Sequence, residues 1–167
     1  MHSQLKEIKN IGIVGLGLIG GSLALDLQSL GHTIYGVTHR ETSAIEAKKR
    51  KLAQVISTEI NVLKNCSLII LALPLEQIIR PTQKLIQALP QDAVVTDVGS
   101  VKEPILNIWH QLHPRFVASH PMAGTDESGV KAGQRNLFKN KPWISTPNKN
   151  TDLEALKIVE QMAIAIG

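Results

Sequence analysis

The stretch from Asn10 to Ser22, which reads NIGIVGLGLIGGS, decides the fold of this 167-residue chain. Its first half is short and apolar, like a buried strand, and its second half begins a segment with apolar residues at helical spacing. Between them lie Gly15, Gly17 and Gly20, in the spacing GxGxxG. Ordinary turns also contain such glycines, but a strand before them and a helix after them are what a dinucleotide-binding turn requires. The stretch therefore predicts a dinucleotide site.

Each of these glycines meets a different physical need. Gly15 permits the tight turn, Gly17 lets the backbone approach a pyrophosphate, and Gly20 lets the helix pack closely on the strand. The free N–H groups and the positive dipole end of the helix would then bind the phosphates. The residues expected to contact the cofactor in this stretch are Gly15, Leu16, Gly17, Leu18, Ile19 and Gly20.

The residues that follow the second strand indicate which dinucleotide fits. Residues 33–37 alternate as a strand, and an NAD site would have a carboxylate at its end, roughly 20 residues beyond the glycines. This chain has Thr38, His39 and Arg40 there. A hydroxyl can donate to a phosphate and an arginine can pair with one through two hydrogen bonds, so we expect NADP in preference to NAD. In the alternative, Arg40 is a solvated loop charge and Glu41 binds the ribose.

Strands and helices are expected to alternate along the rest of the chain. This alternation predicts an α/β fold with a doubly wound, mostly parallel sheet of the Rossmann type. We expect residues 1–167 to form one dinucleotide-binding domain. The expected strands cover residues 11–14, 33–37, 68–73, 93–97, 116–119 and 143–145; the expected helices follow the glycine turn, begin at the capping box of residues 43–46, and cover residues 60–63, 76–89, 104–112 and 152–166.

Composition excludes several other functions. The chain is 43% hydrophobic with a net charge of +4 and has no apolar run long enough to span a bilayer. It also begins without a signal-like run, so we expect a cytoplasmic protein without a membrane partner. The single cysteine, Cys66, excludes an internal disulfide and a cysteine zinc site, and no metal is expected. Nucleic acid is not an expected partner, because aromatic residues make up 3% and the basic run 48–51 lies at a helix end.

Three segments should meet the glycine turn, because the carboxyl ends of parallel strands share one edge of a sheet. They are Leu73-Pro74, which we expect to contact the cofactor, Asp97 to Lys102, and His120 to Thr125. A histidine at position 120 can take a proton from an alcohol as hydride leaves the same carbon, and Ser100 can orient it or the substrate. The alternative is a hydrogen-bonded structural histidine. The other histidines are expected on the surface: His2, His32, His39, His110 and His113.

Three motifs together resemble the prephenate and arogenate dehydrogenase family of tyrosine biosynthesis. They are VGLGLIGGS at residues 14–22, TDVGSVK at 96–102 and HPMAGT at 120–125, and Asn136-Leu137-Phe138 is a further point of likeness. Many dehydrogenases share the first motif, whereas the second and third are much more specific. Within the family, the chain is most similar to the cyanobacterial arogenate dehydrogenases, which prefer NADP.

This resemblance implies an oxidative decarboxylation of arogenate to tyrosine, or of prephenate to 4-hydroxyphenylpyruvate. The ring hydroxyl would lose its proton to His120, hydride would pass to the nicotinamide, and the ring carboxylate would leave as carbon dioxide. Ser100 would hydrogen-bond His120 or the substrate hydroxyl beside the cofactor, and Thr125 would lie near the substrate. Asp97 would hold the turn before Ser100, and Lys102 would be a charge at the start of a helix or, in the alternative, would contact the cofactor or substrate.

Members of this family carry a second, helical domain that forms a homodimer and completes the substrate pocket, and this chain stops before it. We therefore expect cofactor binding with little or no turnover by the chain alone. Two other interpretations stay open. One is an NADP-binding module without activity of its own, and the other is a β-hydroxyacid-type dehydrogenase, which would leave the motif around His120 unexplained. The choice between arogenate and prephenate also stays open.

Overall fold

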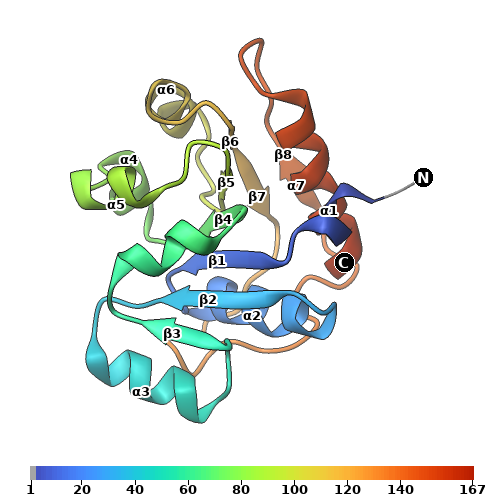
Figure 1. Cartoon of the computed structure of the whole chain (residues 1–167). Helices are drawn as coiled ribbons and strands as arrows, with labels where there is room; N and C mark the ends of the chain where they lie inside the picture. Colours follow the sequence, from blue (N-terminus) through green and yellow to red (C-terminus); the bar gives the residue numbers. More distant parts are fainter. Residues whose placement is uncertain (1–2) are drawn as a thin grey trace.

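A parallel sheet forms the centre of the computed structural model, which describes residues 3–167 (Figure 1). From β1 (Asn10–Val14) the chain first adds β2 (Thr33–Val37) and β3 (Val55–Ser57) on one side. It then crosses to the other side of β1 and adds β4 (Leu68–Leu71), β5 (Val94–Asp97) and β6 (Phe116–Val117). The resulting order, β3-β2-β1-β4-β5-β6, has its switch point between β1 and β4, where such sheets bind ligands. The expected doubly wound, Rossmann-type sheet is confirmed.

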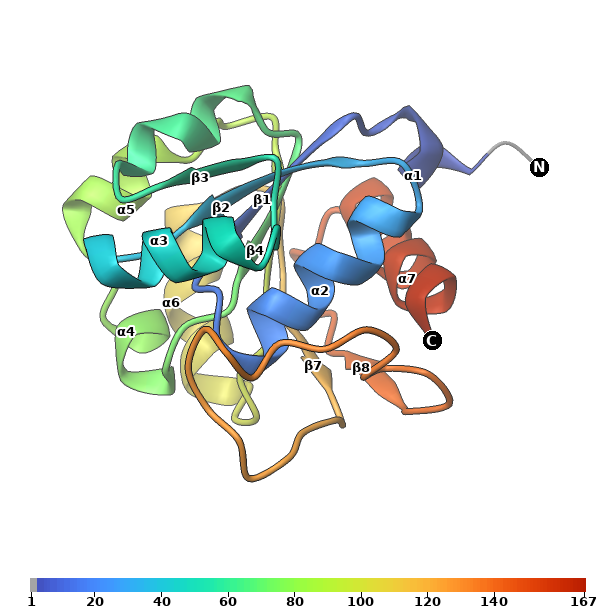
Figure 2. The same ribbon diagram turned by 90° about the horizontal axis from the view of Figure 1, so that it is seen from below.

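Helices cover both faces of this sheet (Figure 1 and Figure 2). On one face lie α2 (Leu18–Ser29), α3 (Glu41–Lys49) and α7 (Leu153–Ile166). On the other lie the 3-10 helix η1 (Ile60–Asn65), α4 (Leu75–Ile79), α5 (Gln83–Ala88) and α6 (Glu103–Leu112), while the short α1 (Gln4–Glu7) contacts α7. No helix within residues 3–167 has the length and apolar character needed to cross a membrane.

The central strands are apolar on both faces because both faces are covered. In β1, Ile11 and Ile13 belong to the core beneath α2 and α7, whereas Val14 belongs to the core beneath α4, α5 and α6. In β4, Ile70 and Ile69 divide between the two cores in the same way. Each fully buried aliphatic side chain contributes about 1.5–3 kcal/mol, so the two cores hold the sheet edge that carries the site.

The end of the chain departs from the expected single sheet. The sixth expected strand, β8 (Trp143–Ser145), pairs antiparallel with β7 (Ser119–Pro121) in a separate two-stranded sheet. The expected strand over 116–119 is therefore divided between β6 and β7. A parallel pairing needs a crossover, which is usually helical, but residues 122–142 contain no helix and return the chain in the opposite direction.

The helices depart from expectation at two places. The helix expected over 76–89 is broken into α4 and α5, because Pro81 has no N–H to donate and forces the residue before it out of helical geometry. The helix expected from Ser43 begins two residues earlier, with Arg40 as its N-cap. Strand β3 was not expected at all, since its half-buried residues show no clear alternation. The final helix is capped by Asp152, whose Oδ1 accepts from Ala155 N at 2.8 Å.

Two histidines expected on the surface are buried. His32 Nδ1 bonds to Ile8 O at 2.7 Å, and His113 Nε2 bonds to Pro90 O at 2.9 Å. Burial lowers the pKa of His113. Cys66 is also buried, and burial raises the pKa of its thiol to about 12. These three side chains are structural, whereas His2 lies outside the described residues.

The glycine turn shows which of its glycines the fold itself requires. A Cβ on Gly15, whose φ is +95°, would lie 2.3 Å from the carbonyl oxygen of Ala72, and one on Gly20 would lie 1.8 Å from the carbonyl oxygen of Gly15. A Cβ on Gly17 would meet nothing within 4 Å. The protein therefore needs Gly15 and Gly20 for its own packing, and Gly17 leaves space that the fold does not use.

We predict that Gly20→Ala destabilises the chain by about 3 kcal/mol or more, because the added methyl meets rigid backbone. The matched variant Gly17→Ala should lose less than about 1 kcal/mol, the cost of a poorer N-cap. Urea denaturation of both variants, followed by far-ultraviolet circular dichroism, measures the difference. Equal stabilities for the two variants would contradict the packing role given to Gly20.

Candidate functional site

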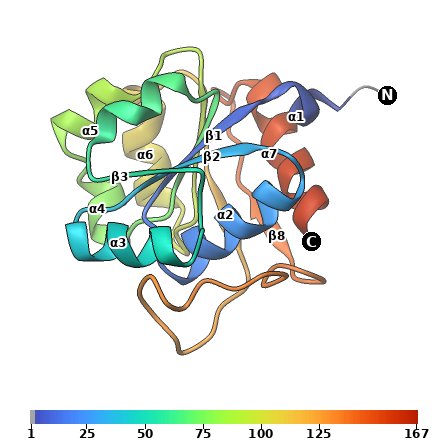
Figure 3. The same ribbon diagram turned by 60° about the horizontal axis from the view of Figure 1, so that its bottom comes forward.

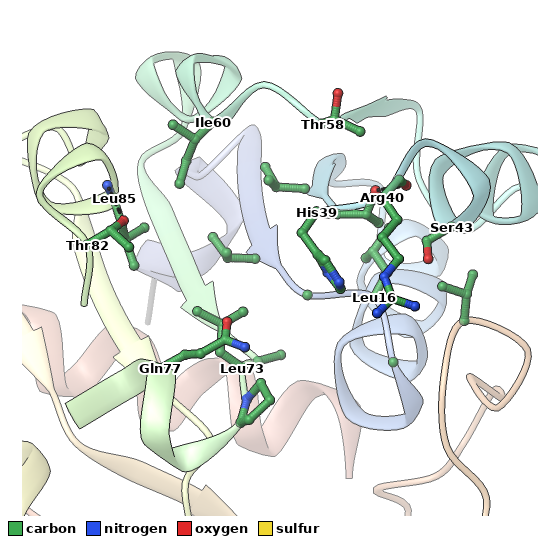
Figure 4. Close-up of a pocket in the computed structure, with 18 of the residues that line it drawn as sticks. Leu16, His39, Arg40, Ser43, Thr58, Ile60, Leu73, Gln77, Thr82 and Leu85 are labelled. Atoms are coloured by element: carbon green, nitrogen blue, oxygen red, sulfur yellow. Dashed lines mark hydrogen bonds between the residues drawn. The ribbon is translucent and has the colours of Figure 1, made fainter. Parts of the chain in front are cut away.

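The carboxyl ends of β1, β2 and β4 border a cavity of about 670 Å³. Backbone hydrogen bonds hold its walls together: Gly15 N donates to Val37 O at 2.9 Å, and Ala72 N donates to Val14 O at 2.9 Å. Figure 4 shows side chains from the segment after β2 and from α4 and α5 on its two sides. The cavity lies at the sheet edge where the sequence predicts the dinucleotide.

The glycine turn forms one border of the cavity. Gly15, Leu16 and Gly17 line it, and Gly17 is the N-cap of α2. N–H groups in the first turn of a helix have no intrahelical partners, so this border offers donors to an anion. Leu18 and Ile19, in that first turn, and the buried Gly20 are not among the lining residues.

The segment after β2 forms a second border with a cation. Thr38, His39, Arg40 and Ser43 line the cavity, and in Figure 4 His39 and Arg40 extend together toward Leu16 and the glycine turn. Thr38 is buried, and its hydroxyl donates to the carbonyl oxygen of Arg40 at 3.3 Å. Arg40 is exposed and makes no ion pair within residues 3–167. Its guanidinium is free to bind a ligand.

The opposite border comes from the broken helix that follows β4. Leu73 and Pro74 line the cavity as expected, and Gln77, Arg80 and Lys84 join them. Arg80 pairs with Glu76 at 2.8 Å and Lys84 with Glu59 at 3.6 Å, both at exposed positions. None of the described residues that line the cavity is acidic. The cavity is thus suited to an anionic ligand, and the sequence analysis did not predict Arg80 and Lys84 at its border.

His120 lies on β7, apart from the residues that line the cavity. Its Nδ1 is 2.9 Å from the carbonyl oxygen of Val98, in the turn that follows β5. A carbonyl oxygen can only accept, so in the neutral ring Nδ1 carries the proton and Nε2 keeps a lone pair. The half-buried imidazole is therefore set up to accept a proton at Nε2.

Ser100 and Thr125 are both exposed and, like His120, do not line the cavity. Within residues 3–167, the imidazole of His120 is held by Val98 and makes no hydrogen bond to Ser100. Thr125 Oγ1 accepts from the backbone N–H of Glu127 at 3.2 Å. The described chain thus has two neighbouring regions, a nucleotide-sized cavity and a more open region around His120.

A buried ion pair lies beneath His120. The Lys102 ammonium contacts the Asp97 carboxylate, and the side chain of Lys102 is 14% exposed while that of Asp97 is fully buried. Burial raises the pKa of Asp97 and lowers that of Lys102, while each charge favours ionisation of the other. Asp97 also accepts from Gly99 N at 2.8 Å, as expected for a residue that holds this turn. Lys102 was expected to be a charge at the start of a helix, and the structure shows instead that it is buried against Asp97. The one sign of this in the sequence was the place of Lys102 in the TDVGSVK motif.

A long segment, residues 122–142, passes along α2 (Figure 2 and Figure 3). Its residues Gly129 and Val130 line the cavity. Arg50 holds it, with Nη1 donating to Val130 O at 2.5 Å and Nη2 donating to Gly133 O at 2.6 Å. Ser22 Oγ accepts from Gln134 N at 2.9 Å. Arg50 is therefore a structural residue. It was expected to be a solvated charge in the basic run 48–51, and the structure corrects that expectation.

Comparison with known proteins shows the family. The family described as prephenate dehydrogenase, nucleotide-binding domain, matches residues 23–167. A prephenate dehydrogenase of Bacillus subtilis (strain 168) is 33% identical over 167 residues, which cover 96% of this chain and 44% of the relative. The chain spans about half the length of the curated relatives it matches.

Solved structures agree with this result. Synechocystis arogenate dehydrogenase has a TM-score of 0.86 and 37% identity, over 95% of this chain and 57% of that one. Prephenate dehydrogenase from A. aeolicus, in complex with hydroxyphenyl propionate and NAD⁺, has a TM-score of 0.87 and 35% identity, over 95% of this chain and 57% of that one. Both the family resemblance and the fold inferred from the motifs are confirmed. This chain belongs to the prephenate dehydrogenase family and contains its nucleotide-binding domain.

Proposed function

We propose that residues 1–167 form an NADP-binding domain that serves the oxidative decarboxylation of arogenate or prephenate. The observation that carries the proposal is the cavity at the glycine turn, with the unpaired Arg40 on its border and no acidic residue in its described lining. An anionic dinucleotide fits the charge of this cavity and the N–H donors at the start of α2. The products would be tyrosine or 4-hydroxyphenylpyruvate, carbon dioxide and NADPH.

Preference for NADP rests on the residues after β2. Arg40 can bind a 2′-phosphate through two hydrogen bonds, and a carboxylate that would bind an unmodified ribose is missing from the described lining. Glu41, the alternative ribose ligand, is exposed at the start of α3 and does not line the cavity. The A. aeolicus relative was solved with NAD⁺, so both nucleotides are included in the test below.

For the chemistry, we propose that His120 is the general base. When bound, the nicotinamide supplies the hydride acceptor. Nε2 of His120 takes the proton of the ring hydroxyl, and a carbon–oxygen double bond forms as hydride leaves the same carbon. The ring carboxylate departs as carbon dioxide, the electron pair of its carbon–carbon bond makes the ring aromatic, and the ring oxygen takes up a proton to become the phenol hydroxyl of the product. Ser100 would hydrogen-bond the substrate hydroxyl or His120 beside the cofactor, and Thr125 would lie near the substrate.

A second function, nucleotide binding without turnover, is favoured by one observation. Ser100, His120 and Thr125 lie outside the cavity, and Ser100 and Thr125 are exposed. Reacting groups in contact with water lose much of the electrostatic and positional advantage that hydride transfer needs. The isolated chain would then bind NADP and convert little or no substrate.

We predict that calorimetric titration gives tighter binding of NADP⁺ than of NAD⁺. Arg40→Ala should weaken NADP⁺ binding by about tenfold or more, because a charge-assisted contact to the 2′-phosphate is lost, and should leave NAD⁺ binding unchanged. As a control, Lys49→Ala removes an exposed cation from the far end of α3, the helix that Arg40 caps, and should change neither affinity. An equal loss for both nucleotides in Arg40→Ala would contradict a specificity role.

Gly17→Ala should abolish or weaken binding of both nucleotides by about tenfold or more, although the variant folds. The reason is that its new methyl group occupies space that the protein leaves open and a pyrophosphate would need. Gly124→Ala is the matched control, since a Cβ there also meets nothing within 4 Å and Gly124 does not line the cavity. Normal nucleotide affinity in Gly17→Ala would show that the phosphates bind elsewhere.

Turnover tests the proposed chemistry directly. We expect little NADPH from the purified chain with arogenate or prephenate, and sustained production once the chain is fused to the remaining part of the B. subtilis relative. In that fusion, His120→Asn should lower kcat by about 100-fold or more, because proton transfer to a positioned base is lost. Near-normal turnover in His120→Asn would remove His120 from the base role.

A further inference from the structure

The buried pair of Asp97 and Lys102 joins three segments of the chain. Asp97 ends β5, Lys102 is the N-cap of α6, and both contact Ser119, the residue before His120. Asp97 Oδ1 accepts from Ser119 N at 3.1 Å, and Lys102 Nζ donates to Ser119 O at 2.7 Å. Both backbone polar groups of Ser119 are thus bonded to the pair.

The same pair also fixes the turn that faces His120. Asp97 Oδ2 accepts from Gly99 N at 2.8 Å, and the Lys102 ammonium contacts the same carboxylate oxygen. Val98 lies between Asp97 and Gly99 in the sequence, and its carbonyl oxygen is the partner of His120 Nδ1 at 2.9 Å. The two ends of the His120–Val98 hydrogen bond are therefore both attached to one buried ion pair.

Additional hydrogen bonds hold Ser119 itself. Its Oγ donates to Asp97 O at 3.0 Å and lies 2.8 Å from Thr96 Oγ1, which donates to Val117 O at 2.6 Å. Thr96, Asp97 and Ser119 are all fully buried. A satisfied buried polar network of this kind rigidifies the groups that it connects.

Stability alone is a weak explanation for such a pair. Removing two charges from water is unfavourable, and a buried ion pair contributes little more to stability than an apolar pair of the same shape, and often less. The larger consequence of the pair is that it fixes the orientation of Ser119 and of the turn that contains Val98. The ammonium of Lys102 is directed at Asp97 and Ser119, so direct contact with a substrate is not its main role.

We infer that Lys102, through Asp97, is a positioning residue that holds His120 with Nδ1–H on the Val98 carbonyl and Nε2 free to accept a proton. The catalytic importance of this arrangement rests on the proposed function, but the arrangement itself does not. It is a property of the folded chain without nucleotide or substrate. The two can therefore be tested separately.

The test is the tautomer of His120, measured by nitrogen-15 NMR of the histidine rings in the nucleotide-free chain at a pH where the ring is neutral. His120→Asn identifies the signal by removing it. We expect the Nδ1–H form to predominate by about fivefold or more in the unmodified chain, the ratio that one hydrogen bond supports. Lys102→Met should bring the two forms close to equal population, whereas the exposed Lys64→Met should change nothing.

Stability is recorded in parallel by urea denaturation. If Lys102→Met unfolds because Asp97 is left charged and buried, the double variant D97N/K102M removes both charges, and the same tautomer shift is expected in it. A folded variant that keeps the Nδ1–H form, with only a lower denaturation midpoint, would overturn the inference. Failure of NADP⁺ to bind, with the tautomer shift observed, would overturn the proposed function alone.

Discussion

Close packing of backbone on backbone at the glycine turn is the constraint on which the rest of the structure depends. Gly20 lies against the carbonyl group of Gly15, and Gly15 lies against that of Ala72, so closely that neither position has space for a Cβ. The end of β1, the start of α2 and the end of β4 are brought together in this way. Because α2 begins so close to the sheet, its first turn borders the cavity and offers N–H donors there. The glycine that packing does not require, Gly17, is the one with open space beside it.

The two regions of the site are built by different interactions. The cavity is shaped by backbone contacts at strand ends, and its charge comes from exposed cations, of which Arg40 alone lacks a carboxylate partner among residues 3–167. The region around His120 is instead held by a buried polar network that connects β5, α6 and β7. Exposed cations suit a ligand that is itself charged and hydrated. A buried network suits a side chain that must keep one direction.

The sequence predicted the parts of the fold that depend on local pattern. The glycine turn, the apolar central strands and the helix that begins near Pro104 each follow from neighbouring residues, and the structure contains all of them. The parts it missed depend on partners far apart in the chain. His32 and His113 are polar residues whose burial is satisfied by distant carbonyl oxygens, and no local pattern indicates such partners.

The candidate site also has parts that neighbouring residues predict and parts that depend on distant partners. The segments from Gly15 to Gly17 and from Thr38 to Arg40 both line the cavity, since each directly follows a strand, and their contact with a cofactor stays a prediction. Arg80 and Lys84 were not anticipated, because they reach the cavity only where Pro81 breaks the expected helix into two. The role of Lys102 was also hidden, since its burial depends on the return of the chain at Ser119.

Nucleotide binding and proton transfer place different demands on water, and the two regions of the described chain differ in the same respect. Contacts between phosphates and N–H groups or an exposed guanidinium tolerate water, because bridging waters can complete them. Proton and hydride transfer gain most where water is excluded and charges interact strongly. Around His120, Val101 is 44% exposed and Met122 is 52% exposed, so apolar side chains there face solvent. The imidazole is nevertheless already held from below by Val98 and the ion pair of Asp97 and Lys102. The direction of the imidazole is therefore fixed within this fold, and exclusion of water is a separate requirement of the proposed proton transfer that any covering structure would add.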